Sequence, residues 1–296
     1  MSAMEIGGVR YLIRGENSDW AGHLCAFHQA FIRESTGDSD SRLALVDVRI
    51  FMRREPLPDA AAMDLVHNES RAWAMYRQGE NHVMVYRPPV FENSLWAARF
   101  DRDGTRVDVF HSEEALHYPF PPFSHPLDQM ILVFALSAWK GALVHAAGLG
   151  INGKGFVFAG KSGAGKSTVS RLFDQAGRFN LLSDERVVLR ELPEGFRVYG
   201  TPWHSDAYIS GAADLPLRAM FFLHHGDENT LVRCNPARTL ELLLPLVSIP
   251  WFDRERMTHT MDFLGRMIEA IPCFDLYFRP DQGITMEMQE FAEKLG

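Results

Sequence analysis

The stretch Phe156-Val-Phe-Ala-Gly-Lys-Ser-Gly-Ala-Gly-Lys-Ser-Thr168 carries the strongest structural signal in the chain. An apolar run ends at Gly160, and the segment from Gly160 to Ser167 matches the pattern G-x-x-x-x-G-K-[S/T]. This order predicts a strand, then a loop that wraps phosphate oxygens with backbone N–H groups, then a helix whose positive end faces the phosphate. We expect that helix over residues 165–176.

The residue types of this loop are those that a nucleoside triphosphate requires. The glycines allow close backbone approach and left-handed dihedral angles, Lys166 places a positive charge on the β- and γ-phosphates, and the Ser167 hydroxyl is a ligand for Mg²⁺. The sequence therefore predicts that ATP and Mg²⁺ bind here. The expected nucleotide-binding residues are Gly160, Lys161, Ser162, Gly163, Ala164, Gly165, Lys166, Ser167 and Thr168.

Two acidic segments could complete a catalytic site around the loop. One is an apolar run that ends in Asp184 and Glu185, and the other is the run 220–227, which ends in Asp227. After Glu185 the chain continues into another strand-like run and a Pro-Glu-Gly turn, which is typical of a hairpin rather than of alternating strands and helices. The pattern favours the first pair, and a conventional P-loop ATPase that uses Asp227 remains the alternative.

Composition limits the class of protein around this site. The chain has 296 residues, 46% of them apolar and 23% charged, which predicts one large or two modest folded domains. Its formal charge of −8 argues against a nucleic-acid partner. No apolar run approaches the ~20 residues of a membrane-spanning helix, and the first residues lack the features of a secretory signal. These patterns predict a cytoplasmic protein with no membrane partner.

Patterning divides the chain near residue 125. Residues 1–125 are expected to form a β-rich α+β region that contains two hairpins, with turns at 78–81 and 101–104, and the proline-rich segment 118–126 marks the boundary. Residues 126–296 are expected to begin with a helix over 127–139. Further strands are predicted over 43–51, 71–76, 142–151, 156–160, 179–183, 187–192, 196–199, 218–224 and 273–278, and further helices over 236–248, over 253–270 and from 283.

Three segments together resemble a known family. Val144-His-Ala-Ala-Gly148, the loop region 151–168 and Leu182-Ser-Asp-Glu-Arg-Val187 resemble the catalytic domain of bacterial HPr serine kinase/phosphorylase, most clearly over residues 141–204. The resemblance implies a mixed, largely antiparallel P-loop core related to ATP-dependent phosphoenolpyruvate carboxykinase, within an α/β protein.

The resemblance also assigns roles to residues outside the loop. It implies that Asp184 is the acid/base residue, that Glu185 binds the metal with Ser167, and that His145 lies beside the phosphate. Glu185 stands where the family has a second aspartate, and the family's protein-substrate signature is not recognisable. The segment 200–204 resembles one found in related proteins and could lie by the nucleotide or the acceptor, or form a rigid turn.

The predicted function is Mg-ATP-dependent transfer of the γ-phosphate to a hydroxyl. The acceptor, a serine of a protein or peptide or a small-molecule alcohol, stays open, as does the homo-oligomer that the family's tendency suggests. A different class is a nucleotide-binding sensor or assembly module without efficient transfer. Five arginines are candidates for neutralising the transferring phosphate: Arg186, Arg190, Arg218, Arg233 and Arg238.

Overall fold

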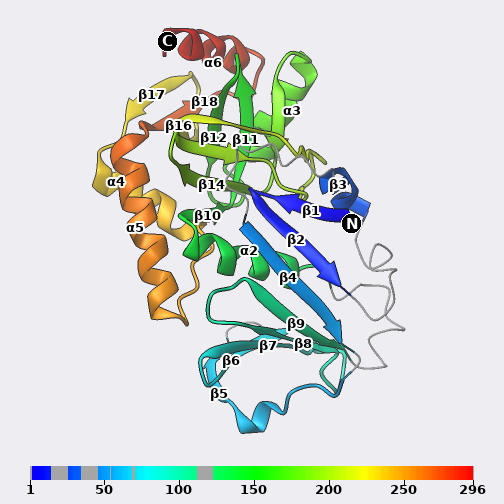
Figure 1. The fold of residues 1–296 in the computed structure, drawn as a ribbon. Coiled ribbons are helices and arrows are strands. Elements are labelled where there is room, and N and C mark those ends of the chain that lie inside the picture. The colour runs from blue at the N-terminus through cyan, green and yellow to red at the C-terminus, as the bar shows by residue number, and fades with distance from the viewer. Residues whose placement is uncertain are drawn as a thin grey trace. The chain divides into compact units, whose positions relative to one another are not determined.

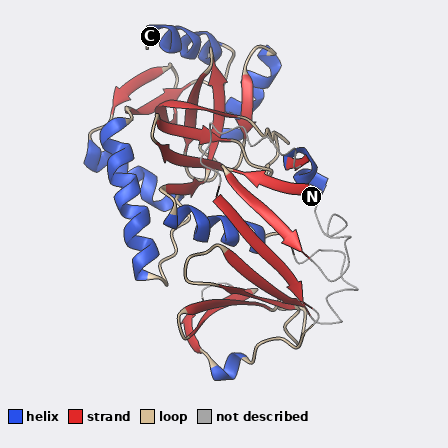
Figure 2. Ribbon diagram, viewed as in Figure 1, coloured by secondary structure: helices blue, strands red, loops and turns tan. Residues whose placement is uncertain are grey.

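The computed structural model describes residues 2–14, 26–34, 46–53, 55–68, 71–111 and 123–295. The chain forms two compact units: unit 1 is Met1–Ala138 with Pro250–Met257, and unit 2 is Trp139–Ile249 with Thr258–Gly296. Each unit is built on a nine-stranded sheet with few helices, so the protein is a β-rich, mixed α/β protein (Figures 1 and 2). Within the described residues, no helix has both the length and the apolarity needed to cross a lipid bilayer.

Unit 1 has the strand order β3-β1-β2-β4-β9-β8-β7-β6-β5. Neighbouring strands are antiparallel except that β4 runs parallel to both β2 and β9. Its elements are β1 (Ser2–Ile6), β2 (Val9–Arg14), η2 (Ala26–Phe31), β3 (Ile32–Glu34), β4 (Val46–Arg53), η3 (Ala60–Ala62), β5 (Asp64–His67), β6 (Trp73–Gln78), β7 (Asn81–Tyr86), β8 (Trp96–Phe100), β9 (Arg106–His111) and α2 (Leu127–Ala138).

Both hairpins predicted in this region are confirmed. Strands β6 and β7 pair up to Gln78 and Asn81, and the turn between them uses Gly79 at φ 62°. The turn between β8 and β9 uses Gly104 at φ 69°, where a side chain would also meet the Phe134 backbone oxygen at 3.2 Å. Glycine suits these positions because only it adopts positive φ without steric cost.

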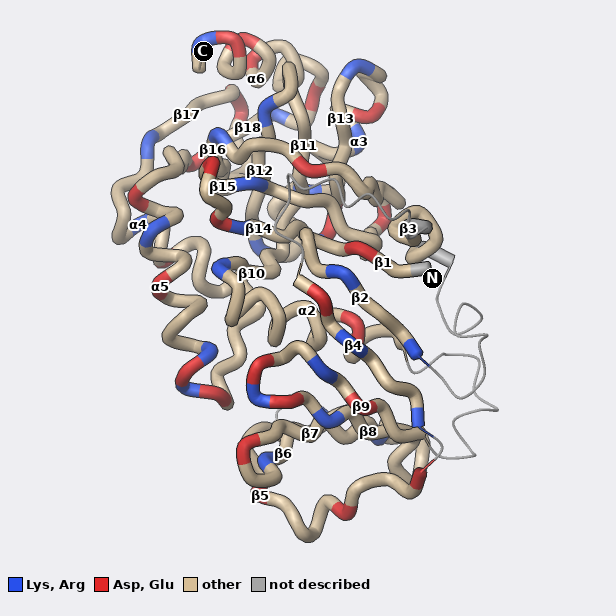
Figure 3. The backbone as a smooth tube through the Cα atoms, in the orientation of Figure 1, with Lys and Arg blue, Asp and Glu red and all other residues tan. Residues whose placement is uncertain are grey.

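Charged and apolar residues alternate along the central strands of unit 1. In β2 and β4, Val9 and Val46 are buried, whereas Arg10 and Asp47 point to the other face and form an ion pair at 2.7 Å. Figure 3 shows the basic and acidic residues distributed along these strands. One face of the sheet is therefore core, and the opposite face is held by charge pairs.

The helix predicted over 127–139 is confirmed as α2, which belongs to unit 1, so the division between the units comes after this helix. Residues 118–122 of the proline-rich segment predicted to mark the boundary lie outside the described residues. Residues 43–45 of the predicted strand 43–51 also lie outside them.

Unit 2 has the strand order β10-β14-β15-β16-β12-β11-β13, with β18 added beside β16 and β17 beside β18. Its elements are β10 (Gly141–Val144), β11 (Ala146–Ile151), β12 (Lys154–Ala159), α3 (Lys166–Ala176), β13 (Asn180–Ser183), β14 (Val187–Leu192), β15 (Gly195–Tyr199), β16 (Asp214–His225), β17 (Thr230–Arg233), α4 (Pro236–Leu243), η4 (Leu244–Leu246), β18 (Cys273–Phe278) and α6 (Gly283–Lys294). Helix α5 (Arg254–Ala270) begins in unit 1 and continues in unit 2.

Strand β12 lies inside this sheet, antiparallel to β11 and parallel to β16, and β16 is also parallel to β18. Its side chains Phe156 and Phe158 are fully buried with Val169 and Phe173 of α3 and with residues of α6. This packing sets the position where β12 ends and α3 begins. The predicted mixed, largely antiparallel arrangement of strands agrees with this sheet.

Two sequence predictions for unit 2 need correction. Residues 142–151 were expected to form one strand, but the chain breaks at His145: β10 pairs with β14, whereas β11 pairs with β12 and β13. Uniformly small and apolar residues on both sides of His145 hide this change of partner in the sequence. The helix predicted over 236–248 ends at Leu243, and a short 3₁₀ turn containing Pro245 follows it.

Candidate functional site

The glycine-rich segment forms a loop between the end of β12 and the start of α3. Gly163 and Gly165 both have positive φ, 81° and 103°. A side chain at Gly165 would stand 2.6 Å from Cζ of Phe278, so this position needs glycine for space as well as for conformation. The predicted helix 165–176 is confirmed as α3, whose first-turn N–H groups face the loop.

Lys166, the first residue of α3, spans the loop from inside. Its side chain is only 7% exposed, and its Nζ donates to the Gly160 carbonyl at 2.9 Å and to the Lys161 carbonyl at 3.3 Å. Burial lowers the pKa of the Lys166 ammonium, and the Glu185 carboxylate opposes this effect. The positive charge is therefore held under the loop, within electrostatic reach of an acidic residue.

The outer part of the loop is accessible. Lys161, Ser162 and Gly163 are exposed, while Ala164 and Thr168 are half-buried. His225, at the end of β16, has its Nε2 3.0 Å from the Gly163 carbonyl oxygen. The sequence did not single out His225 for this contact, because the contact depends on β16 lying next to β12.

Asp184 follows β13 and is completely buried. Its Oδ1 accepts from the Ser205 N–H at 3.0 Å, and its Oδ2 accepts from the Ser205 hydroxyl at 2.7 Å and from the Ala207 N–H at 2.9 Å. Three neutral donors thus hold this carboxylate, and no ion pair reaches it in the described part of the chain.

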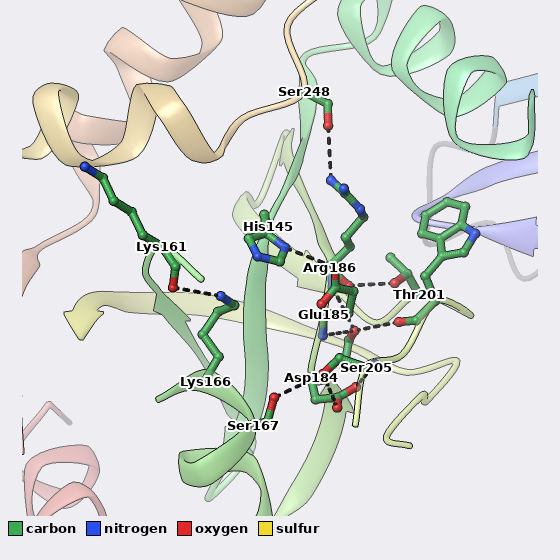
Figure 4. Close-up of polar contacts among 12 residues, drawn as sticks. His145, Lys161, Lys166, Ser167, Asp184, Glu185, Arg186, Thr201, Ser205 and Ser248 are labelled. Atoms are coloured by element: carbon green, nitrogen blue, oxygen red, sulfur yellow. Dashed lines mark hydrogen bonds and ion pairs between the residues drawn. The ribbon is translucent and has the colours of Figure 1, made fainter. Parts of the chain in front are cut away.

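Ser205 connects Asp184 to the loop. Its hydroxyl oxygen is 3.1 Å from the hydroxyl oxygen of Ser167, the second residue of α3 (Figure 4). A serine has one hydroxyl proton, and Ser205 gives it to Asp184, so Ser167 is the donor in the second bond. Ser167 Oγ, Ser205 Oγ and Asp184 Oδ2 are therefore linked by two successive hydrogen bonds. They come from α3, from the segment 200–211 and from the residue after β13.

Glu185 turns towards a different partner from that of Asp184. Its Oε1 is 3.3 Å from Nδ1 of His145, and both side chains are about a quarter exposed, 28% and 26%. The contact with His145 holds the pKa of Glu185 below its usual value, with Arg186 and Lys166 adding to the effect and burial opposing it. The strand break at His145 puts this side chain beside the acidic turn (Figure 4).

A second layer of hydrogen bonds fixes the acidic turn. Ser183 Oγ accepts from the N–H groups of Glu185 and Arg186 at 3.2 Å and donates to the Trp203 carbonyl. Thr201 Oγ1 donates to the Arg186 carbonyl at 2.6 Å. The segment 200–204 that the sequence highlighted therefore packs beside the acidic residues.

Of the five arginine candidates, Arg186 lies at this site. Its positive charge lowers the pKa of Lys166 and the pKa of Glu185. Its Nη1 donates to Ser248 Oγ at 3.4 Å. Arg238 pairs with Glu241 and Asp275. Arg190 is buried beside Tyr199, and Arg218 and Arg233 are exposed on strands β16 and β17.

Asp227 lies in a different setting. It follows β16, the parallel neighbour of β12, and is exposed. Among the described residues no contact joins it to the loop, whereas Asp184 is one hydroxyl away from Ser167. The geometry thus links the loop to the first acidic pair more directly than to Asp227.

The oxygen-rich donors fit a magnesium ion that comes with a nucleotide. Ser167 and Glu185 offer a hydroxyl and a carboxylate, the hard ligands that Mg²⁺ takes. Across the described residues, no three His, Cys, Asp or Glu side chains gather into a metal site of their own. Mg²⁺ commonly completes its shell with phosphate oxygens and water, so it needs few ligands from the protein.

No protein-family model matches this chain, and no curated protein sequence matches it either. The function is therefore argued from the loop, the acidic turn and the segment that joins them.

Proposed function

We propose that unit 2 is a Mg-ATP-dependent kinase that transfers the γ-phosphate to a hydroxyl, on a P-loop core of the HPr kinase type. The observation that carries this proposal is the chain of oxygens from Ser167 through Ser205 to Asp184. It sets a carboxylate one hydroxyl away from the start of the helix where the triphosphate would bind. A carboxylate in this position can orient or deprotonate the hydroxyl of an acceptor.

In this mechanism the loop amides and Lys166 bind the β- and γ-phosphates. The Lys166 ammonium has three N–H donors, and two of them now point to the carbonyl oxygens of Gly160 and Lys161. The third N–H would bind a phosphate oxygen, which is a stronger acceptor than a carbonyl because it is charged. Ser167 and Glu185 would hold Mg²⁺, which neutralises charge that develops on the transferring phosphate.

Asp184 accepts the acceptor's proton. A general base must lie within about 2.6–3.2 Å of the hydroxyl it deprotonates. The Ser205 hydroxyl holds such a position now, donating to Asp184 Oδ2 at 2.7 Å, and the hydroxyl of an external acceptor would take its place. His145 Nδ1 lies 3.3 Å from Glu185 Oε1. The two adjacent carboxylates thus have different tasks, Asp184 with the proton and Glu185 with the metal.

The proposal is tested by screening peptide and small-alcohol acceptors with γ-labelled ATP and Mg²⁺, with ADP release measured in parallel. We expect ADP release that depends on the acceptor, together with label on its hydroxyl. Tight ATP binding with negligible ADP release for every acceptor would favour the sensor or assembly module. The complete burial of Asp184 is the structural observation that supports this alternative.

A conventional P-loop ATPase is the second candidate, favoured by the parallel pairing of β12 with β16, the strand that leads to Asp227. It predicts ADP release with water as the acceptor. In that case Asp227→Asn would be the damaging change and Asp184→Asn the mild one.

A further inference from the structure

The segment 200–211 presents one of its own hydroxyls to the catalytic base proposed above. We propose that Ser205 is an internal phosphoacceptor, so that the chain transfers the γ-phosphate of ATP to its own Ser205. This inference rests on the proposed kinase function. It names an acceptor inside the chain, whereas the acceptor of that function is a separate molecule.

Ser205 is in direct contact with Asp184. Ser205 Oγ donates to Asp184 Oδ2 at 2.7 Å, the arrangement of a hydroxyl nucleophile with its base. Thr201, in the same segment, donates its hydroxyl to the Arg186 carbonyl instead. Within the described residues, Ser205 is the hydroxyl that donates to Asp184.

Ser205 also lies next to the residue that follows the glycine-rich loop and Lys166. Its Oγ is 3.1 Å from Ser167 Oγ, at the N-terminal end of α3. The exposed N–H groups of a helix N-terminus attract phosphate oxygens, and the glycine-rich loop precedes this one. The hydroxyl of Ser205 therefore lies beside the place where the γ-phosphate is proposed to bind (Figure 4).

The segment 200–211 is fixed at both ends by hydrogen bonds. The Gly200 N–H donates to the Ala213 carbonyl at 2.9 Å, and the Gly211 N–H donates to the Leu182 carbonyl at 2.8 Å. The N–H groups of Ser205 and Ala207 also bind Asp184. An acceptor held in this way needs no further ordering before it reacts, which is a large part of what an enzyme contributes to a transfer.

The reaction balances without any other reactant. Ser205 Oγ attacks the γ-phosphorus of ATP, a new O–P bond forms, and the bond between the γ-phosphorus and the β,γ-bridging oxygen breaks. ADP leaves, and the hydroxyl proton passes to Asp184 Oδ2. Once Asp184 has released that proton to solvent, the phosphate, with about −1.5 to −2 charges, and the carboxylate repel each other, so the phosphate is displaced from Asp184.

The test incubates the full chain with ATP and Mg²⁺ and no added acceptor, then measures intact mass and maps phosphopeptides. We expect one phosphoryl group per chain, on Ser205, at a rate per chain that does not change with protein concentration. An unmodified chain, a phosphate on another residue, or a rate per chain that rises with protein concentration would overturn the inference.

Three variants make the assignment specific. Ser205→Ala should lose the modification, and Ser205→Thr should retain it as phosphothreonine. Ser205→Ala keeps both backbone donors to Asp184, so an unchanged melting temperature confirms that it is folded. Ser210→Ala is the matched control, five residues along the same segment, and should be modified like the unaltered chain. Retained phosphorylation in Ser205→Ala contradicts the inference.

Parallel assays separate this inference from the kinase proposal. If an external hydroxyl is phosphorylated while Ser205 stays unmodified, the kinase proposal stands and the internal acceptor is wrong. If ATP binds but neither ADP release nor modification follows, both proposals fail.

Discussion

Two buried carboxylates, one in each unit, are held in opposite ways. Asp108 of unit 1 is 5% exposed and is surrounded by guanidinium groups, with Arg53 Nε at 2.7 Å, Arg106 Nε at 3.2 Å and Arg99 Nη2 at 3.4 Å. Asp184 of unit 2 is completely buried and is held by two backbone N–H groups and one hydroxyl.

The difference separates a structural carboxylate from one suited to chemistry. Burial raises the pKa of Asp108, but Arg106 and Arg53 together outweigh it and hold this pKa below its usual value. The charge of Asp108 is thus matched by cations and links strands β4, β8 and β9. Asp184 has neutral donors only, one of them a hydroxyl that could give up its proton.

The largest expected effect separates the two carboxylates directly. Asp184→Asn removes the base and should lower phosphate transfer by roughly 10²–10⁴-fold while ATP still binds. Asp108→Asn is the control and should leave transfer unchanged, as should Asp227→Asn. Rates of ADP release with a saturating acceptor measure all three. Equal rates for Asp184→Asn and the unaltered chain would remove Asp184 from its role.

A smaller but still large effect is expected from the buried lysine. Lys166→Ala removes the charge under the loop and should reduce transfer by about 10²–10³-fold, with a loss of ATP affinity measured by calorimetry. Lys154→Ala is the matched control, because Lys154 begins β12 and donates to the Ala292 carbonyl at 2.8 Å, away from the loop. Unchanged ATP affinity in Lys166→Ala would contradict the assignment of the loop.

Two of the three loop glycines provide a test of stability. Gly165→Ala combines positive φ with a 2.6 Å approach to the Phe278 ring, and it should lower the free energy of unfolding by about 1–3 kcal/mol. Gly163→Ala has positive φ but nothing within 4 Å of the added carbon, so its cost should be smaller. Urea unfolding compares the two, and equal losses would show that the contact with Phe278 is unimportant.

The smallest expected effect concerns the pH dependence of unit 1. Because the folded pKa of Asp108 is lowered, its stabilising contribution is present above the unfolded pKa, about 4, and is lost as pH falls through the folded value. Its arginine partners are partly exposed, so Asp108→Asn should cost only about 1 kcal/mol at pH 7. Unfolding curves should converge with the unaltered chain at low pH; a constant difference would argue against a charge effect.

Local signals in the sequence predicted the loop and the elements around it. The glycine pattern identified the turn between β12 and α3, where positive φ and the ring of Phe278 demand glycine at position 165. The apolar runs and the Pro-Glu-Gly turn identified the hairpin of β14 and β15. These features depend on residues close together in the chain, so a short window contains the information.

Contacts between distant segments could not be read in the same way. Ser205 contacts Asp184, which is 21 positions away in the sequence, and Ser167, which is 38 positions away. The sequence revealed neither the break at His145 nor the short strand β17. Each depends on pairing with a strand that is distant in the sequence: β10 pairs with β14, and β17 pairs with β18. Asp184 and Glu185 are neighbours with similar chemistry, and only the surrounding elements turn them to different partners.

The central claim is that residues 160–167 bind the triphosphate of ATP with the acidic turn facing it. A crystal structure of the full chain with Mg²⁺ and a non-hydrolysable ATP analogue tests it most directly. We predict phosphate oxygens on the loop N–H groups and on Lys166 Nζ, with Mg²⁺ between Ser167 and Glu185. A nucleotide bound elsewhere, with no phosphate oxygen on Lys166 Nζ, would contradict the account.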